Sequence, residues 1–229
     1  MQTVNKMPPW SYTALTAYEN CPKRYYLTRV AKTFHDTQNE AAIWGNRVHI
    51  ELENAVKTGK PLPEGMEQWQ HYVDKFYKLS RSPKNKVFTE RQLAVDKNFR
   101  PVEWMAPNAW CRGIVDIGVL SGDTLVACDW KTGKRKPDST QLALFAGLLF
   151  AHFPRVKKVK TVFIWLQDRK SDKSEYLVED RAEIWNEFLP RVQRMGNAFA
   201  EDRWEPKPSG LCRGWCPCSS CDYHQPKRS

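Results

Sequence analysis

The sequence has no hydrophobic segment long enough to cross a membrane. Its longest apolar run, residues 142 to 153, is about half as long as the roughly 20 residues that a transmembrane helix needs. Residues 1 to 9 contain no apolar stretch of the kind that directs secretion. We therefore expect a cytoplasmic protein. In that compartment disulfide bonds are rare, and clustered cysteines more often bind a metal.

Internal repeats, low-complexity segments and an excess of acidic residues are also absent. The 36 lysines and arginines outnumber the 26 aspartates and glutamates, which gives a formal net charge of +10. This balance favours a polyanionic partner, nucleic acid before membrane, although it also serves simple solubility. With 229 residues, 41% of them hydrophobic, the chain can form one large domain or a domain with an appendage.

A predicted β-hairpin over residues 110 to 131 is the feature around which the sequence is organised. Two β-prone runs flank Gly122 and Asp123, and a two-residue Gly-Asp link between such runs is typical of a hairpin turn. Centring the turn on this link pairs Ser121 with Thr124. The register of the whole hairpin follows from that pair.

The predicted register brings two carboxylates together. Asp116 lies opposite Asp129, with Cβ atoms roughly 5 Å apart, and Lys131 projects from the same face. Carboxylates this close repel each other unless a cation or a proton lies between them, and Mg²⁺ prefers such oxygen ligands. The hairpin therefore predicts a metal site beside a lysine, which suits phosphoryl chemistry. The alternative is an exposed structural cluster of aspartate and lysine.

The other elements follow from hydrophobic periodicity and from capping and turn residues. The expected helices cover residues 11–29 with an interruption at Pro22, 39–58, 66–79, 138–153 and 183–201. The expected strands outside the hairpin cover residues 87–96, 158–167 and 175–178, and residues 97–109 form a loop. The expected N-caps are Ser11 and either Asp138 or Ser139. This order predicts a mixed α/β sheet with helices at both ends.

Three polar residues on these elements are considered for the site. His49 lies on an apolar helical stripe, where a histidine is either a core residue or a metal ligand directed at the hairpin. Gly45, about one turn earlier, would let that helix pack closely. Gln141 opens an otherwise apolar helix. Glu90 either lies near the site or faces solvent, and we expect the second.

Two basic segments are candidates for contact with nucleic acid. One mixes cations with aromatic rings, as proteins that bind single strands do, and comprises Lys23, Arg24, Tyr25, Tyr26 and Arg29. The alternative for it is an ordinary pair of amphipathic helices. The other is the turn after the hairpin, with Lys134, Arg135 and Lys136 beside the predicted metal site. The alternative for this turn is a solvated loop.

Four of the 7 cysteines fall within ten residues, a strong metal signal: Cys212, Cys216, Cys218 and Cys221. These four, or three of them with His224, could hold Zn²⁺. The other ligand set replaces Cys218 with the distant Cys21 and holds an iron–sulfur cluster, since Cys21 and Cys216 each precede a proline. The remaining two, Cys111 and Cys128, are expected to be small apolar residues of the hairpin strands.

In this combination the residues resemble the PD-(D/E)XK nuclease superfamily, and within it the RecB-like exonucleases. The likeness is greatest to the CRISPR-associated and phage-encoded type that carries an iron–sulfur cluster, and it covers nearly the whole chain. The matching motifs run from Ser11 to Pro22 (S-x-x-x-L-x-x-Y-x-x-C-P), Gly45 to His49 (G-x-x-x-H), Gly113 to Asp116 (G-x-x-D), Asp129 to Lys131 (D-x-K) and Gln141 to Phe145 (Q-x-x-x-Y). Each motif is weak alone, but all of them in this order form a specific signal.

The resemblance implies a restriction-endonuclease-like α-β-β-β-α-β core and a set of roles. The implied ligands of a catalytic Mg²⁺ or Mn²⁺ are His49, Asp116, Asp129 and the backbone carbonyl of Trp130. Lys131 would position or activate the attacking water, and Gln141 would contact Lys131 or the DNA. The implied ligands of a [4Fe–4S] cluster are Cys21, Cys212, Cys216 and Cys221. Two residues depart from the pattern. Phe145 lacks the hydroxyl group of tyrosine. Cys218 is an extra thiol among the ligands, so the fourth ligand and the identity of the metal, iron–sulfur or Zn²⁺, stay open.

The resemblance also implies an organisation and an activity. We expect one nuclease domain over residues 1–229, with a helical part at 1–80, a catalytic core at 87–168, and a C-terminal helix and cysteine cluster at 180–229 packed with Cys21. The expected activity is that of a metal-dependent DNA exonuclease acting on single-stranded or end-containing DNA in processing or recombination, in the host cytoplasm if phage-encoded. The alternatives are a weak or inactive nuclease fold that binds DNA with protein partners in a larger complex, and a zinc-stapled interaction module.

Overall fold

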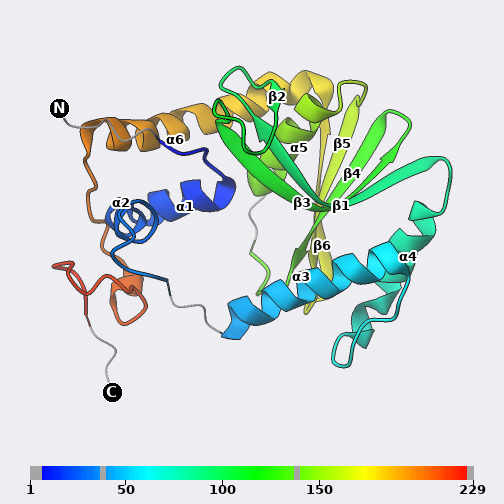
Figure 1. The fold of residues 1–229 in the computed structure, drawn as a ribbon, viewed down its shortest axis with the longest axis horizontal. Coiled ribbons are helices and arrows are strands. Elements are labelled where there is room, and N and C mark those ends of the chain that lie inside the picture. The colour runs from blue at the N-terminus through cyan, green and yellow to red at the C-terminus, as the bar shows by residue number, and fades with distance from the viewer. Residues whose placement is uncertain (1–6, 37–39, 137–139, 226–229) are drawn as a thin grey trace. The chain divides into compact units, whose positions relative to one another are not determined.

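The computed structural model describes residues 7–36, 40–136 and 140–225 (Figure 1). The chain divides into two compact units, one of residues 39–186 and one that combines residues 1–38 with residues 187–229. Each unit is described by itself below. The single nuclease domain over residues 1–229 stays a prediction.

A six-stranded sheet with the order β2-β1-β3-β4-β5-β6 forms the centre of the unit of residues 39–186. β4 and β5 are parallel, and all other neighbouring strands are antiparallel. The strands are β1 (Asn85–Val95), β2 (Pro101–Val102), β3 (Cys111–Ser121), β4 (Thr124–Lys131), β5 (Lys158–Trp165) and β6 (Lys170–Leu177). The sheet is therefore mixed, as predicted.

The hairpin of β3 and β4 forms in the predicted register. Ser121 pairs with Thr124 across the two-residue turn, and the ladder continues to the pair of Ile117 and Cys128. Gly122 has a φ of +60°, a left-handed backbone that suits glycine in such a turn. The turn thus determines which residues of the two strands face each other.

Helices α3 (Glu40–Thr58), α4 (Gln70–Ser80) and α5 (Thr140–His152) cover this sheet (Figure 1). α3 and α4 bury apolar side chains against one face, where Cys128 and Trp130 belong to the core. α5 is buried along most of its length and connects β4 to β5, because a parallel pair needs a crossover. Counting α3, β1, β3, β4, α5 and β5, the predicted α-β-β-β-α-β core is confirmed.

The other unit contains helices from both ends of the sequence. They are α1 (Tyr12–Asn20), α2 (Pro22–Tyr25), a π-helical turn (Tyr26–Val30) and the part of α6 (Arg181–Glu201) from residue 187 onward. Ser11 caps α1 as predicted, since its Oγ accepts a hydrogen bond from the N–H of Ala14 at 3.2 Å.

Aromatic rings form the core of this second unit. The contacts involve Tyr18, Tyr25, Tyr26, Phe199 and Trp204. Tyr25 is only 4% exposed, and Tyr26 stacks on Trp204 with ring centroids 5.0 Å apart. Because these rings serve the core, the interpretation of this segment as an ordinary pair of helices is favoured over base stacking.

Some predicted boundaries are wrong for physical reasons. β6 begins at Lys170 rather than at residue 175, because an edge strand tolerates polar residues on its exposed side. The loop at residues 97–109 contains the short strand β2, and a 3₁₀ turn at Glu67–Trp69 precedes α4. The candidate caps Asp138 and Ser139 lie outside the described residues. Within the described ranges, no helix combines the length and apolar character needed to span a bilayer.

Replacing Gly118 by alanine should lower the free energy of unfolding by about 1–3 kcal/mol. A Cβ on Gly118 would lie 2.0 Å from Cζ of Phe88, and the Phe88 ring is itself stacked on Phe153 with centroids 5.6 Å apart. Denaturant unfolding measures the change. Gly133→Ala is the control, because a Cβ there would have no atom within 4 Å. Equal effects of the two substitutions would contradict the packing argument.

Candidate active site

The strands of the hairpin separate where the two predicted carboxylates lie. The β3–β4 ladder ends at Ile117 and Cys128, so Asp116 and Asp129 occupy the next positions outward. Asp116 Oδ2 accepts a hydrogen bond from the backbone N–H of Trp130 at 2.7 Å, so a side chain satisfies this strand donor. Both aspartates are buried, with 7% and 5% of their surface exposed. Burial of two like charges requires compensation from their neighbours.

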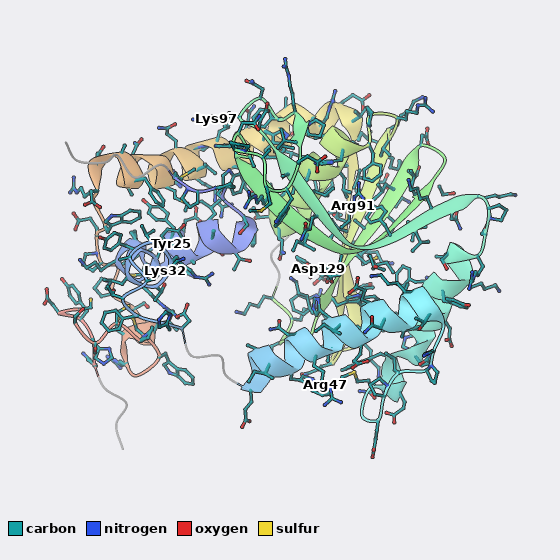
Figure 2. The ribbon with its side chains drawn as sticks, in the orientation of Figure 1. Tyr25, Lys32, Arg47, Arg91, Lys97 and Asp129 are labelled. Atoms are coloured by element: carbon teal, nitrogen blue, oxygen red, sulfur yellow. The ribbon has the colours of Figure 1, made fainter. Side chains whose placement is uncertain are left out.

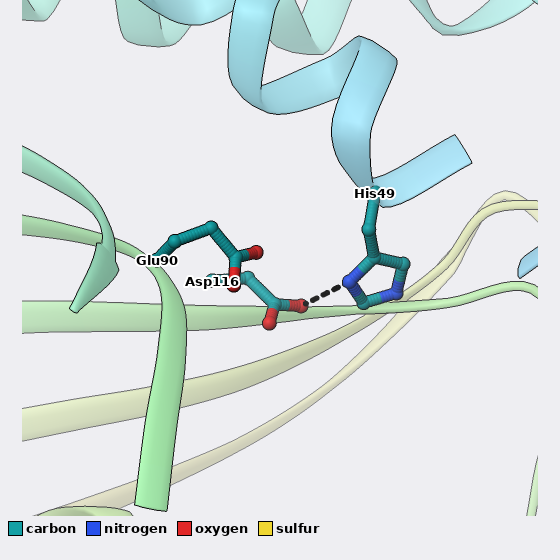
Figure 3. Close-up of side chains that lie close together, drawn as sticks. All are labelled: His49, Glu90 and Asp116. Carbon is teal, nitrogen blue, oxygen red and sulfur yellow. Dashed lines mark ion pairs between the residues drawn. The ribbon is translucent and has the colours of Figure 1, made fainter. Parts of the chain in front are cut away.

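His49 reaches this opening from α3. Its Nδ1 lies 3.3 Å from Asp116 Oδ2 (Figure 3), and its Nε2 donates a hydrogen bond to the carbonyl of Trp130 at 2.9 Å. The helix approaches closely because residue 45 is glycine, since a Cβ on Gly45 would lie only 3.0 Å from Thr132 Oγ1. His49 therefore contacts the hairpin rather than only filling the core.

Glu90 on β1 is a third acidic residue at the opening. Sequence reasoning places it in solvent, and this is wrong. Glu90 lies opposite Asp116, and the β1–β3 ladder continues on both sides of this position. Ligand atoms, one each from Glu90, Asp116 and His49, lie within 4.8 Å of one another. The long connection from β1 to β3 gives no turn that fixes their register, so the sequence alone does not pair the two carboxylates.

The backbone of Glu90 is strained. Its φ of +45° is left-handed, which costs a residue other than glycine roughly 1–3 kcal/mol. Ladder pairs on either side hold the strand in place against this cost. Such strain is concentrated at functional sites, so the conformation adds to the case that Glu90 belongs to the site.

Lys131 is held between two acceptors at the end of β4. Its Nζ lies 2.6 Å from Asp129 Oδ2 and donates a hydrogen bond to Gln141 Oε1 at 3.0 Å. Gln141 Nε2 lies 3.5 Å from Asp129 Oδ1, and the ammonium group lies 4.7 Å from the ring centroid of Phe163. The predicted contact between Gln141 and Lys131 is thus present, and it gives the ammonium group a defined position.

The electrostatics of the group favour a bound cation. Burial, followed by repulsion from Asp116 and Glu53, raises the pKa of Glu90 to about 7. Burial and the charge of Asp116 also raise the pKa of Asp129, although Lys131 opposes this effect. Oxygen ligands that repel one another in this way fit a hard divalent ion, which removes the penalty when it binds.

The charge of His49 responds to the same carboxylates. Burial alone would lower the pKa of His49, but its hydrogen bond to Asp116 and the charges of Asp116 and Asp129 outweigh that effect and raise it. A histidine in this position can either neutralise a carboxylate as an imidazolium or, when neutral, bind a metal.

A cavity of about 670 Å³ gives access to these groups. α3 supplies one wall, including His49 and Ile50, and residues 129–133 with Glu90 supply another. Asp129 is labelled in Figure 2, close to α3. The three residues whose ligand atoms lie within 4.8 Å of one another are His49, Glu90 and Asp116. Asp129 is not among them, and its carboxylate pairs with Lys131. The ligand set of His49, Asp116, Asp129 and the Trp130 carbonyl stays a prediction.

The predicted DNA contacts lie in both units. Lys134, Arg135 and Lys136 are exposed just beyond the cavity lining, and Arg135 Nε donates to Asp172 at 3.0 Å. Arg24 belongs to the other unit, where its Nη2 lies 2.7 Å from Asp36 Oδ1. Contact of these residues with DNA stays a prediction.

Five cysteines line one small cavity in the unit of residues 1–38 and 187–229. They are Cys21, Cys212, Cys216, Cys218 and Cys221, all free thiols. Backbone N–H groups of Arg24 and Lys207 lie 3.5 and 3.4 Å from Cys21 Sγ. Such donors stabilise sulfur in the thiolate form that binds metals. Cys111 and Cys128 are buried in strands of the other unit, as expected of small apolar residues.

The spacing of the sulfurs bears on the choice of metal. A single tetrahedral zinc ion would bring its sulfur ligands to about 3.8 Å from one another. Within the described part of the chain, no three cysteine sulfurs lie within 4.8 Å of one another. Cys218 is 1% exposed, and burial together with Cys216 raises its pKa to about 12, so this thiol resists ionisation. Which of the five thiols would bind a metal stays a prediction.

The chain was compared with protein families, curated proteins and solved structures. The family model of the PD-(D/E)XK nuclease superfamily matches residues 9–225. Among curated proteins, none matches the chain in sequence. Among solved structures, the chain is similar to SSO0001 at 16% identity, covering 97% of this chain and 90% of that chain, with a TM-score of 0.49. It is also similar to a "Putative exonuclease" from Eubacterium rectale at 11% identity, covering 96% and 90%, with a TM-score of 0.51, a likeness of fold.

Mn²⁺ should raise the thermal unfolding midpoint of the wild-type protein and have little effect on Asp116→Asn. Binding to the folded state alone stabilises it by about 2.7 kcal/mol at 100 times the dissociation constant. Differential scanning calorimetry with and without Mn²⁺ measures the shift. Asp123→Asn, at the exposed turn of the same hairpin, is the matched control and should respond like the wild type. A full response of Asp116→Asn would show that the ion binds elsewhere.

Proposed function

The chain belongs to the PD-(D/E)XK nuclease superfamily, and on that basis we propose that it is a metal-dependent DNA exonuclease. The observation that carries the proposal is the convergence of carboxylates, His49, Lys131 and Gln141 from α3, three strands and α5 at one opening of the sheet. A binding protein has no need for buried carboxylates that repel one another. A hydrolase can use them to hold a cation.

The residues that would hold the metal are His49, Asp116, Asp129 and the Trp130 carbonyl, with Glu90 beside them. A bound Mg²⁺ or Mn²⁺ ion would neutralise the carboxylates and polarise a phosphate group. Glu90 is our addition to this set, and its position opposite Asp116 supports it.

Lys131 would act on the substrate directly. Asp129 and Gln141 hold its ammonium group in the cavity wall, where it can orient the attacking water and offset the negative charge that develops on the phosphate. Gln141 would act through this contact, as a positioning residue. Phe145 is buried and only 4% exposed, so it offers no substrate contact from this helix.

The substrate we propose is DNA that is single-stranded or has free ends, in DNA processing or recombination. The net charge of +10 and the basic residues 134–136 beyond the cavity support a polyanionic substrate. The motif pattern of the RecB-like exonucleases and the name of the E. rectale protein with a similar fold favour an exonuclease.

We further propose that Cys21, Cys212, Cys216 and Cys221 hold a [4Fe–4S] cluster, with Zn²⁺ as the alternative. The shared cavity and the N–H groups directed at Cys21 support the cluster. Cys218 would remain as an additional buried thiol beside it.

Oxygen-free wild-type protein should degrade end-labelled linear single-stranded DNA with Mn²⁺, and the order in which label is released would report polarity. The double variant Asp129→Asn, Lys131→Met should be slower by about 10²- to 10⁴-fold, because it loses both a carboxylate and the ammonium group. The matched control is Asp123→Asn, Lys157→Met, which removes the same charges at the opposite, exposed end of the sheet.

The proposal fails if the wild-type protein releases no label with any divalent ion, or if both double variants cut equally fast. Salt-sensitive DNA binding without cleavage would instead support a nuclease fold retained for binding within a larger complex.

Anaerobically purified protein should contain iron and acid-labile sulfide. It should also absorb visible light, as iron–sulfur clusters do. Cys21→Ser should reduce the iron content strongly, because it removes a ligand from the opposite end of the chain, whereas Cys128→Ser should keep it. A colourless protein with stoichiometric zinc, unaffected by Cys21→Ser, would replace the cluster with a local zinc site.

A further inference from the structure

Arg24 lies against the cysteine cavity and is anchored there. It lines the cavity together with Cys21, Cys216 and Cys218, and its own backbone N–H is directed at Cys21 Sγ. Its side chain is 30% exposed, and Nη2 lies 2.7 Å from Asp36 Oδ1. This ion pair limits where the guanidinium can move.

A metal bound by the cysteines would leave an excess of negative charge in the cavity. Cysteine ligands bind metals as thiolates, so four of them carry more negative charge than a zinc ion or a [4Fe–4S] core supplies in positive charge. The described cationic residues that line the cavity are Lys23, Arg24 and Lys207. Lys207 directs its Nζ to the carbonyl of Glu19 at 2.8 Å. Arg24 is the cation that both borders the sulfurs and is fixed by a carboxylate.

We infer that Arg24 is a positioning residue of the cysteine centre: Asp36 anchors its guanidinium so that its charge stabilises the thiolates of the ligands Cys21 and Cys216. The inference rests on the proposal that these cysteines hold a metal. It replaces the prediction that Arg24 contacts DNA. The electrostatic influence of Cys216 and Cys218 on the pKa of Arg24, and of Arg24 on that of Cys218, is consistent with this proximity.

The surroundings of Arg24 argue against a role in DNA binding. The aromatic residues next to it in the sequence, Tyr25 and Tyr26, already pack against Trp204. Asp36 would repel a phosphate approaching the same guanidinium. A cation already paired with a carboxylate and bordering a metal cavity is better placed to act on the metal centre.

The test compares metal loss from oxygen-free full-length variants. Arg24→Gln should lose its metal to a chelator about tenfold faster than the wild type, in line with the effect of groups next to metal ligands. Bathophenanthroline reports iron, and 4-(2-pyridylazo)resorcinol reports zinc. Arg24→Lys should retain most of the stability, because it keeps the charge. If the metal is an iron–sulfur cluster, Arg24→Gln should also shift its reduction potential to a more negative value, because the reduced state carries more negative charge.

Arg29→Gln is the matched control, because it removes the same charge from a side chain that is 53% exposed and lies 4.0 Å from Asp36. Asp36→Asn provides a second test that keeps the charge of Arg24 but releases the guanidinium, and its rate should fall between those of the wild type and Arg24→Gln. Salt-dependent DNA affinity is measured in parallel and should be equal for Arg24→Gln and Arg29→Gln.

Metal loss from Arg24→Gln at the wild-type rate, or at the same rate as from Arg29→Gln, would overturn the inference. A selective loss of DNA affinity in Arg24→Gln would restore the DNA contact. A wild-type protein that contains neither iron nor zinc would refute the metal centre itself and the inference with it, whatever the variants do.

Discussion

Repulsion among carboxylates that the sheet holds together is the constraint on which the rest of the site depends. Asp116 and Asp129 lie where β3 and β4 stop pairing, and Glu90 lies opposite Asp116 from β1. The sheet fixes all three positions, so none of these side chains can move away without disturbing the ladder. His49 and Lys131 each contact one of the aspartates and offset part of this charge.

The same constraint explains why the neighbouring residues are as they are. Gly45 is small because α3 must come close enough for His49 to reach Asp116. Gln141 offers its carbonyl oxygen to Lys131, which keeps the ammonium group beside Asp129 and away from the other carboxylates. Trp130 places its indole in the core against Tyr72 and Phe76, and its two backbone polar groups face Asp116 and His49. The side chain of Trp130 thus packs in the core, while its backbone groups contact the polar residues of the site.

Local sequence signals were sufficient to predict the register of the β3–β4 hairpin. They were insufficient to predict how β1 pairs with β3. The Gly-Asp turn determines the register of β3 and β4, so the juxtaposition of Asp116 and Asp129 could be predicted from a few residues. Glu90 could not be placed, because the connection from β1 to β3 is long and nothing local specifies which residues pair. The surroundings of Arg24 could not be predicted for a related reason. Its partner Asp36 and the cysteines around it come from three separate segments, and cations next to tyrosines look alike whether they bind DNA or border a metal.

The division of the chain also sets an order of synthesis. The unit that carries the carboxylates is continuous in sequence, from residue 39 to residue 186, whereas the unit with the cysteine cavity is interrupted by it. A ribosome completes the whole unit of residues 39–186 before it reaches Cys212, and at roughly 5–20 residues per second the last cysteine follows on the order of seconds later. Cys21 emerges early and has to wait through that interval for its partners. If the cysteines hold a metal as proposed, its insertion is a late step, and it acts on a chain whose carboxylate-bearing unit has already been made.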